Sequence, residues 1–101
     1  MPTKPSLKKI FKYLLPIKDG PVTLTLPAGS KVVHVGLDPA DRLSLWAEFD
    51  VDSEVANEIR TFEVVGTGHL IDGSLAHLGS VVDKPFVWHV YEKVTGAGRS
   101  P

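Results

Sequence analysis

The sequence contains no cysteine, and this absence removes two kinds of site at once. Without thiols the chain forms neither a disulfide framework nor a thiolate metal centre, so its stability must come from burying apolar side chains. No run approaches the ~20 apolar residues of a membrane helix, and the lysine-rich start lacks the apolar core of a signal peptide. We therefore expect a protein of the cytoplasm.

An excess of charge of one sign is also missing, because 11 Lys and Arg residues stand against 12 Asp and Glu residues. This balance does not predict a nucleic-acid partner, since phosphate binding usually leaves a basic surplus. The charges are nevertheless separated along the chain, with lysines but no acid in residues 1–18 and a run of acids in 38–58. Such separation is typical of a solvated surface, with self-association or a charged partner as the alternative.

The length of 101 residues allows one hydrophobic core, so a single domain over residues 7–93 is expected. Residues 1–6 and 94–101 are poor in core-forming side chains, and we expect them to be flexible tails. Between them apolar and polar residues alternate with a period of two, most clearly in LSLWAEF at 43–49. Six further segments have strand character: 9–17, 21–27, 31–37, 60–65, 74–82 and 86–93.

These segments predict an all-β fold, a single-domain antiparallel β-sandwich or small barrel of about seven strands. Residues 21–27 and 31–37 are expected to form a hairpin across the turn AGS. The acidic stretch 50–59 is interpreted as a long loop, or as one helical turn capped by Ser53. The predicted core consists of Leu24, Leu26, Val33, Val35, Leu45, Phe49, Phe62, Val64, Leu78, Val87 and Trp88.

The stretch VVGTGHLIDG is a candidate binding turn, because Gly66 and Gly68 can adopt positive φ and present backbone N–H groups to an anion. It lacks the glycine spacing of a Walker or Rossmann loop. The favoured interpretation is that Gly66 ends a strand, that His69 or Asp72 hydrogen-bonds the turn, and that Asp72-Gly73 makes the next turn.

Four histidines, His34, His69, His77 and His89, raise the question of a metal site. None is spaced for local convergence, although His77 and His89 could face each other across the final hairpin, and we predict no metal ligand and no cofactor.

Ser74, His69 and Asp72 have the residue types of a catalytic triad but lie on one turn, whereas triads converge from separate elements. The sequence therefore predicts no catalytic residue and a non-enzymatic protein.

A nucleic-acid surface on the first strand would use Lys8, Lys9 and Lys12 beside Phe11 and Tyr13. The two aromatic residues share one face while Lys12 points the other way. This arrangement is weaker than that of a cationic groove interleaved with aromatic rings.

The combination VHVG, a central tryptophan, GTGH and FVWHVYE resembles a family of small uncharacterised proteins encoded by actinobacteriophages, other phages and some bacteria. The resemblance covers about residues 9–93. It implies a compact β domain from a phage or prophage accessory region, and it carries no established activity. That setting favours a protein that binds a host protein, in host takeover or counter-defence, over a metabolic enzyme.

Several strands are apolar on both faces, which leaves surplus apolar surface of the kind that marks interfaces. Binding to a bacterial protein, or self-association, is therefore the leading hypothesis. A small-ligand or nucleic-acid binder that uses the GTGH turn or the basic first strand is the alternative. The candidate binding residues are Trp46, Gly66, Gly68, His69, Trp88, His89 and Tyr91.

Overall fold

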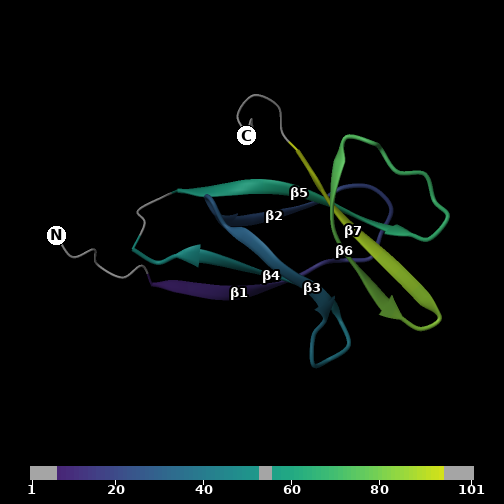
Figure 1. The fold of residues 1–101 in the computed structure, drawn as a ribbon, viewed down its shortest axis with the longest axis horizontal. Helices are drawn as coiled ribbons and strands as arrows, with labels where there is room; N and C mark the ends of the chain where they lie inside the picture. Colours follow the sequence, from purple (N-terminus) through teal and green to yellow (C-terminus); the bar gives the residue numbers. More distant parts are fainter. Residues whose placement is uncertain (1–6, 53–55, 95–101) are drawn as a thin grey trace.

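A computed structural model describes residues 7–52 and 56–94, and these residues form seven strands joined by short connections (Figure 1). The strands are β1 (Lys8–Leu14), β2 (Val22–Pro27), β3 (Lys31–Leu37), β4 (Leu43–Asp50), β5 (Asn57–Gly66), β6 (Leu75–Asp83) and β7 (Phe86–Lys93). The all-β prediction is confirmed. The predicted helical cap Ser53 and, apart from Val94, the two predicted tails lie outside the described residues.

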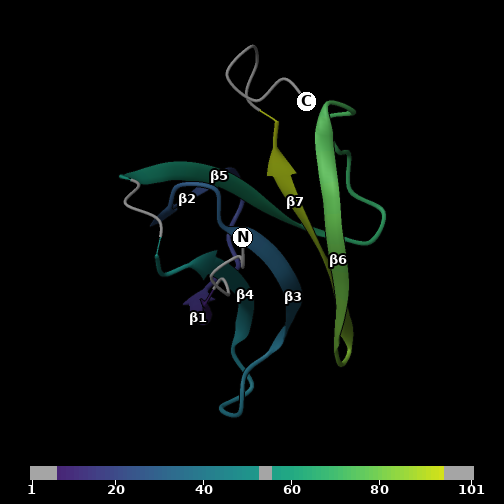
Figure 2. The same ribbon diagram turned by 60° about the vertical axis from the view of Figure 1, so that its left-hand side comes forward.

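The strands form two antiparallel sheets, in the orders β1-β4-β3 and β2-β5-β7-β6. The sheets face each other as a β-sandwich, which decides between the two predicted architectures (Figure 2). β1 lies at one side of the molecule, and the β6–β7 hairpin lies at the other side, beyond β3 (Figure 2). Within the described ranges there is no helix that is long and apolar enough to cross a membrane.

The predicted hairpin between the second and third strands is wrong. β2 pairs with β5 and β3 pairs with β4, so the connection between β2 and β3 crosses from one sheet to the other. Gly29, at φ +81°, turns the chain there, and Ser30 N–H donates to the Pro27 carbonyl at 3.1 Å. The alternation of side chains showed which residues share a face, but it holds no information about which strand lies alongside.

The loop or helical turn predicted over residues 50–59 is also wrong, because strands occupy both ends of this stretch. β4 continues to Asp50, and β5 already begins at Asn57, three residues before the predicted strand. The first residues of β5 do not show the alternation of a half-buried strand, because Asn57 and Glu58 are polar and Ile59 is 71% exposed.

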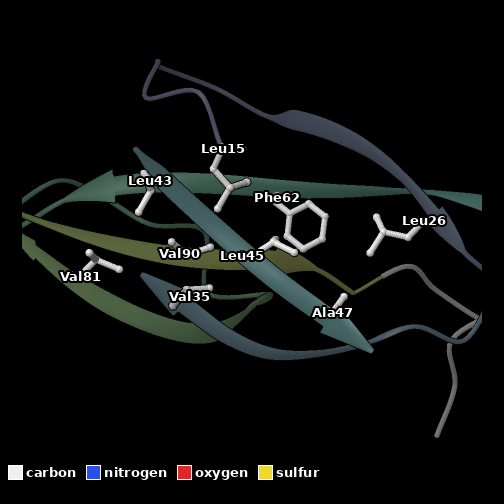
Figure 3. Packing of buried hydrophobic residues seen from close by; sticks show 9 residues of the cluster. All are labelled: Leu15, Leu26, Val35, Leu43, Leu45, Ala47, Phe62, Val81 and Val90. Atoms are coloured by element: carbon white, nitrogen blue, oxygen red, sulfur yellow. The ribbon is translucent and has the colours of Figure 1, made fainter. Parts of the chain in front are cut away.

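The core lies between the two sheets and is built from inward side chains of both (Figure 3). Leu45 on β4 and Phe62 on β5 are fully buried, as are Leu26 and Val90. Figure 3 shows Leu15, just after β1, pointing into the same space. Of the predicted core, Leu26, Val35, Leu45 and Phe62 are buried, and Leu24, Val64, Leu78 and Trp88 pack against them while partly exposed.

Three predicted core residues lie elsewhere. Val33 is 42% exposed because a β-bulge between Val32 and His34 adds a residue to β3, so that Val32 and Val35 face inward instead. Phe49 is half-buried near the end of the central strand β4, with its ring centroid 5.0 Å from that of Phe11. Val87 is half-buried opposite the exposed Val82, on the outer face of its sheet.

A buried ion pair accompanies the apolar core. Arg60 on β5 donates to both carboxylate oxygens of Glu92 on β7, at 2.5 and 2.8 Å, and the two side chains are 6% and 8% exposed. Arg60 Nη1 also donates to the carbonyl of Ser30, the residue just before β3, so the guanidinium links its own sheet to the chain that enters the other sheet. The hydrogen bonds to Glu92 raise the pKa of the Arg60 guanidinium.

Candidate functional site

The edge of the three-stranded sheet at β1 carries the largest group of exposed apolar side chains near one element. β1 pairs with β4 on one side, and no other described strand pairs with it. Exposed fractions of 44–60% belong to Leu7, Ile10, Phe11, Leu14 and Ile17. An edge strand with unpaired backbone groups and apolar side chains can accept a further strand.

The hydrogen bonds at the two ends of β1 show which of its backbone groups face outward. Leu7 C=O accepts from Val51 N–H, and Leu15 N–H donates to Leu43 C=O, both at 2.9 Å. In an antiparallel ladder the groups of every second residue point toward the neighbouring strand. The odd-numbered residues of β1 therefore bond to β4, and the even-numbered residues from position 8 to 14 direct their N–H and C=O groups to the open edge.

Two of the three lysines on β1 are paired with carboxylates of the same sheet. Lys8 Nζ lies 3.3 Å from Glu48, and Lys12 Nζ donates to the buried Asp38 at 2.7 Å. The Lys12 ammonium, together with N–H donors from Arg42 and Ala40, holds the pKa of the Asp38 carboxyl well below its usual range. These pairs reduce the positive charge that β1 offers to solvent.

An apolar cavity of about 450 Å³ opens beside the end of β1. Its lining is mainly apolar, with charged groups at Asp41, Arg42 and Asp83; the apolar lining residues are Leu14, Leu15, Pro16, Ile17 and Leu43. The cavity continues the apolar surface of the β1 edge and has the size to take an apolar side chain of a bound chain.

The GTGH stretch is a turn, as its sequence predicts. His69 N–H donates to the Gly66 carbonyl at 3.2 Å, and Gly68 has φ +91°, a conformation that L residues rarely adopt. Asp72 Oδ1 accepts from the backbone and side chain of Ser74, which lowers the pKa of Asp72. The predicted Asp72-Gly73 turn is present, since Leu75 N–H donates to the Asp72 carbonyl at 3.1 Å.

The turn lies beside Trp88, because Gly66 on β5 pairs with Trp88 on β7. Two cavities, of about 570 and 310 Å³, share Gly66, His69 and Trp88 in their lining. Phe86 stacks on Trp88 with ring centroids 5.3 Å apart, and both rings line the larger cavity. The structure therefore brings three predicted site residues together around one indole ring.

His89 belongs to a chain of hydrogen bonds on the outer face of the four-stranded sheet. Its Nε2 lies 2.8 Å from Thr67 Oγ1, and its Nδ1 lies 2.7 Å from Ser80 Oγ, which lies 3.1 Å from His77 Nε2. A bulge between His77 and Gly79 turns His77 onto this face, so that the two histidines meet through Ser80. Gly79 in the middle of β6 is a local signal for such a bulge, but it does not predict which side chains meet there. Ser80 and Thr67 were not among the predicted site residues.

Trp46 and Tyr91, the other predicted binding residues, lie apart from Trp88. Trp46 is on β4, half-buried, with its ring 5.3 Å from that of His34 on the outer face of the three-stranded sheet. Tyr91 lies beside His77 on the outer face of the other sheet, with the ring centroids 5.1 Å apart and the ring planes tilted by 59°. The three aromatic residues thus belong to three surfaces.

Among residues 7–52 and 56–94, no group of three or more His, Asp or Glu side chains lies close enough to hold a metal ion.

Comparison with known proteins gives a family but no activity. No curated protein and no solved structure matches the chain significantly. A family model described as "Domain of unknown function (DUF7352)" matches residues 6–99, which span the whole sandwich. The chain therefore belongs to this DUF7352 family.

Proposed function

We propose that the protein acts by binding another polypeptide, which adds an extended segment to the edge strand β1. The observation that carries this proposal is the exposed apolar surface of β1, on a strand whose even-numbered residues offer unpaired backbone groups. In such complexes the backbone bonds supply affinity, and side-chain pockets supply specificity. The apolar cavity at the end of the strand suits the second role.

The charges on this edge favour a protein partner over a nucleic acid. Lys8 and Lys12 each have a carboxylate partner within the sheet, and Phe11 lies opposite Ala47 on the inner face. Base stacking on a cationic surface needs several unpaired cations beside the aromatic rings. On the face of Phe11 and Tyr13, β1 offers a single lysine, Lys9. An apolar protein segment needs no such cations.

The resemblance to phage-encoded proteins suggests where the partner would be found. In that setting the polypeptide bound by β1 is a protein of the bacterial cytoplasm, met during host takeover or counter-defence, or the chain itself. The proposal requires binding and no chemical step.

Three variants test the edge. Ile10→Pro removes an outward N–H group without touching the β4 ladder, and Ile10→Thr keeps that group while removing apolar surface. Ile59→Thr makes the same replacement at an exposed isoleucine of β5, which is 71% exposed against 56% for Ile10, and serves as the control. We expect Ile10→Pro to lose at least about tenfold in the amount of specific partner captured from bacterial lysate, as measured by quantitative mass spectrometry. Equal capture by all variants, with an unchanged oligomeric state, would refute the proposal.

The cavities around Trp88 favour a second candidate function, the binding of a small planar ligand. Such a ligand would stack on the indole ring between Phe86 and His69. A thermal-shift screen with nucleotides and other aromatic compounds tests it, because a ligand that binds only the folded state raises its stability. The shift should disappear in His69→Ala. If no compound in the screen shifts the parent protein, this candidate is refuted.

A further inference from the structure

We propose that the segment added to β1 is the β1 strand of a second copy of this chain, paired antiparallel about a twofold axis at Phe11. The inference rests on the proposed function and names its partner. Two three-stranded sheets would then form one continuous six-stranded sheet through the pair of first strands.

The backbone of β1 is suited to pairing with itself in this register. Its outward N–H and C=O groups belong to the even-numbered residues, so two copies bond when even-numbered residues stand opposite each other. With Phe11 opposite Phe11, Ile10 pairs with Lys12 of the second copy and Lys8 pairs with Leu14. Because β1 spans Lys8–Leu14, this register is also the one in which every residue of the strand has a partner.

The lysines select the same register. In KKIFKYL with Phe11 at the centre, each lysine stands opposite an apolar or aromatic residue: Lys8 opposite Leu14, Lys9 opposite Tyr13 and Lys12 opposite Ile10. Sliding the strands to the next bonded register places Lys8 opposite Lys12 in one direction and Lys12 opposite Lys12 in the other. Like charges directly opposite each other destabilise a strand pair.

The remaining close approach between lysines is moderated by the sheet itself. Lys12 becomes a diagonal neighbour of both Lys8 and Lys12 of the second copy, but each of these lysines already has a carboxylate partner, Glu48 for Lys8 and Asp38 for Lys12. Each copy therefore brings its own counter-charge to the interface.

The register also covers the exposed apolar side chains. Phe11 meets Phe11 of the second copy, extending the contact that each ring makes with Phe49. Leu7, which is 60% exposed, comes opposite Leu15, and Leu15 lines the apolar cavity at the end of β1. Leu7 of one copy would thus lie at the cavity of the other copy.

The absence of cysteine makes the register directly measurable. Odd-numbered residues form the non-bonded pairs across the twofold, with Cα atoms about 4.5 Å apart, which is within disulfide range. Phe11→Cys should therefore give a covalent dimer under mild oxidation. Lys9→Cys is the matched control, because its Cα lies about 14 Å from that of the second Lys9, four residues away along the strand.

The expected results are a dimer by light scattering for the parent, a monomer for Ile10→Pro, and cross-linking of Phe11→Cys at least about tenfold faster than that of Lys9→Cys. A second measurement does not depend on replacing Phe11. A mixture of Lys9→Cys and Tyr13→Cys chains should form a mixed disulfide, while neither forms a disulfide alone, because residue 9 stands opposite residue 13.

A parent that stays monomeric at all concentrations would overturn the self-pairing. If Ile10→Pro nevertheless failed to capture a lysate protein that the parent captures, the proposed function would stand, with another protein bound to β1. If Ile10→Pro captured the same proteins as the parent, the proposed function and the self-pairing would both be refuted. A dimer that survives Ile10→Pro, or in which Lys9→Cys cross-links as fast as Phe11→Cys, would also overturn this inference.

Discussion

The buried pair of Arg60 and Glu92 allows the sharpest test of how the two sheets are held together. We predict that Arg60→Leu lowers the free energy of unfolding by about 3 to 5 kcal/mol, because Glu92 then loses both hydrogen bonds and remains as a buried carboxylate. For Glu92→Leu we predict a smaller loss of about 2 to 4 kcal/mol. In that variant the Arg60 guanidinium still donates to the Ser30 carbonyl and lies 3.8 Å from the Glu58 carboxylate.

The double variant separates the charge effect from the loss of packing. With both side chains replaced by leucine, no charge remains buried, and the main penalty is the Ser30 carbonyl that has lost its donor, about 1 kcal/mol. The double variant should therefore be more stable than either single variant. Since a domain of this size has about 5 to 15 kcal/mol of stability, Arg60→Lys provides a milder variant that keeps the charge but cannot make all three hydrogen bonds.

The assay is equilibrium denaturation by urea at one fixed protein concentration, so that any dimer contributes equally to each variant. Repeating it at acidic pH adds a control, because the penalty in Arg60→Leu should shrink once the stranded carboxyl is protonated. If the two single variants each cost less than about 1 kcal/mol and their effects add, the reasoning is refuted, since a pair that is coupled through burial cannot behave additively.

Three further predictions concern single positions. Gly68→Val should destabilise by about 1 to 3 kcal/mol in urea unfolding, because Gly68 has φ +91°, and a variant as stable as the parent would contradict the strained turn. Gly79→Ala should cost about 1 to 3 kcal/mol, since the new Cβ would lie 2.4 Å from Val35 Cγ2; Val35→Ala should relieve part of this cost, so strictly additive losses would argue against the clash. The carboxyl of Asp38 has a lowered pKa in the folded state, so its stabilisation is present above about pH 4 and is lost as pH falls further. Urea unfolding of Asp38→Asn should accordingly depend less on pH in that acidic range than the parent, and equal slopes would show that the Lys12 contact does not stabilise the fold.

The strands were predictable because their signal is local. Alternation in LSLWAEF reports a backbone in which neighbouring side chains point to opposite faces, and β4 occupies that segment. Turns were predictable for a similar reason: Gly68 adopts the positive φ that its residue type allows, and Asp72 bonds the turn that follows. Each of these features is decided within a few residues of sequence.

The candidate sites were predictable only in part. The sequence pointed to Gly66, His69 and Trp88 separately, and the pairing of β5 with β7 places them around one indole. Alternation already places Trp88 and Tyr91, three residues apart on β7, on opposite faces of the sheet, but it could not say which surface Trp46 would share. The three lysines of KKIFKYL are typical of an edge strand. They do not say which strand pairs with β1 or that its other side stays open, and only the sheet order shows this.

The sequence by itself determined an all-β chain without disulfides, the segments in which its seven strands lie and the turn at Gly68, since these depend on residues close together in the chain. Only the tertiary structure decided that β2 and β3 lie in different sheets, that bulges at Val33 and after His77 turn side chains to new faces, and that Arg60 meets Glu92. The strand pairing and the Arg60–Glu92 contact depend on which surfaces pack best across the sandwich, and the partners are tens of residues apart, so no local pattern records them. A glycine such as Gly79 marks a place where a bulge can form, but the packing decides whether the strand uses it.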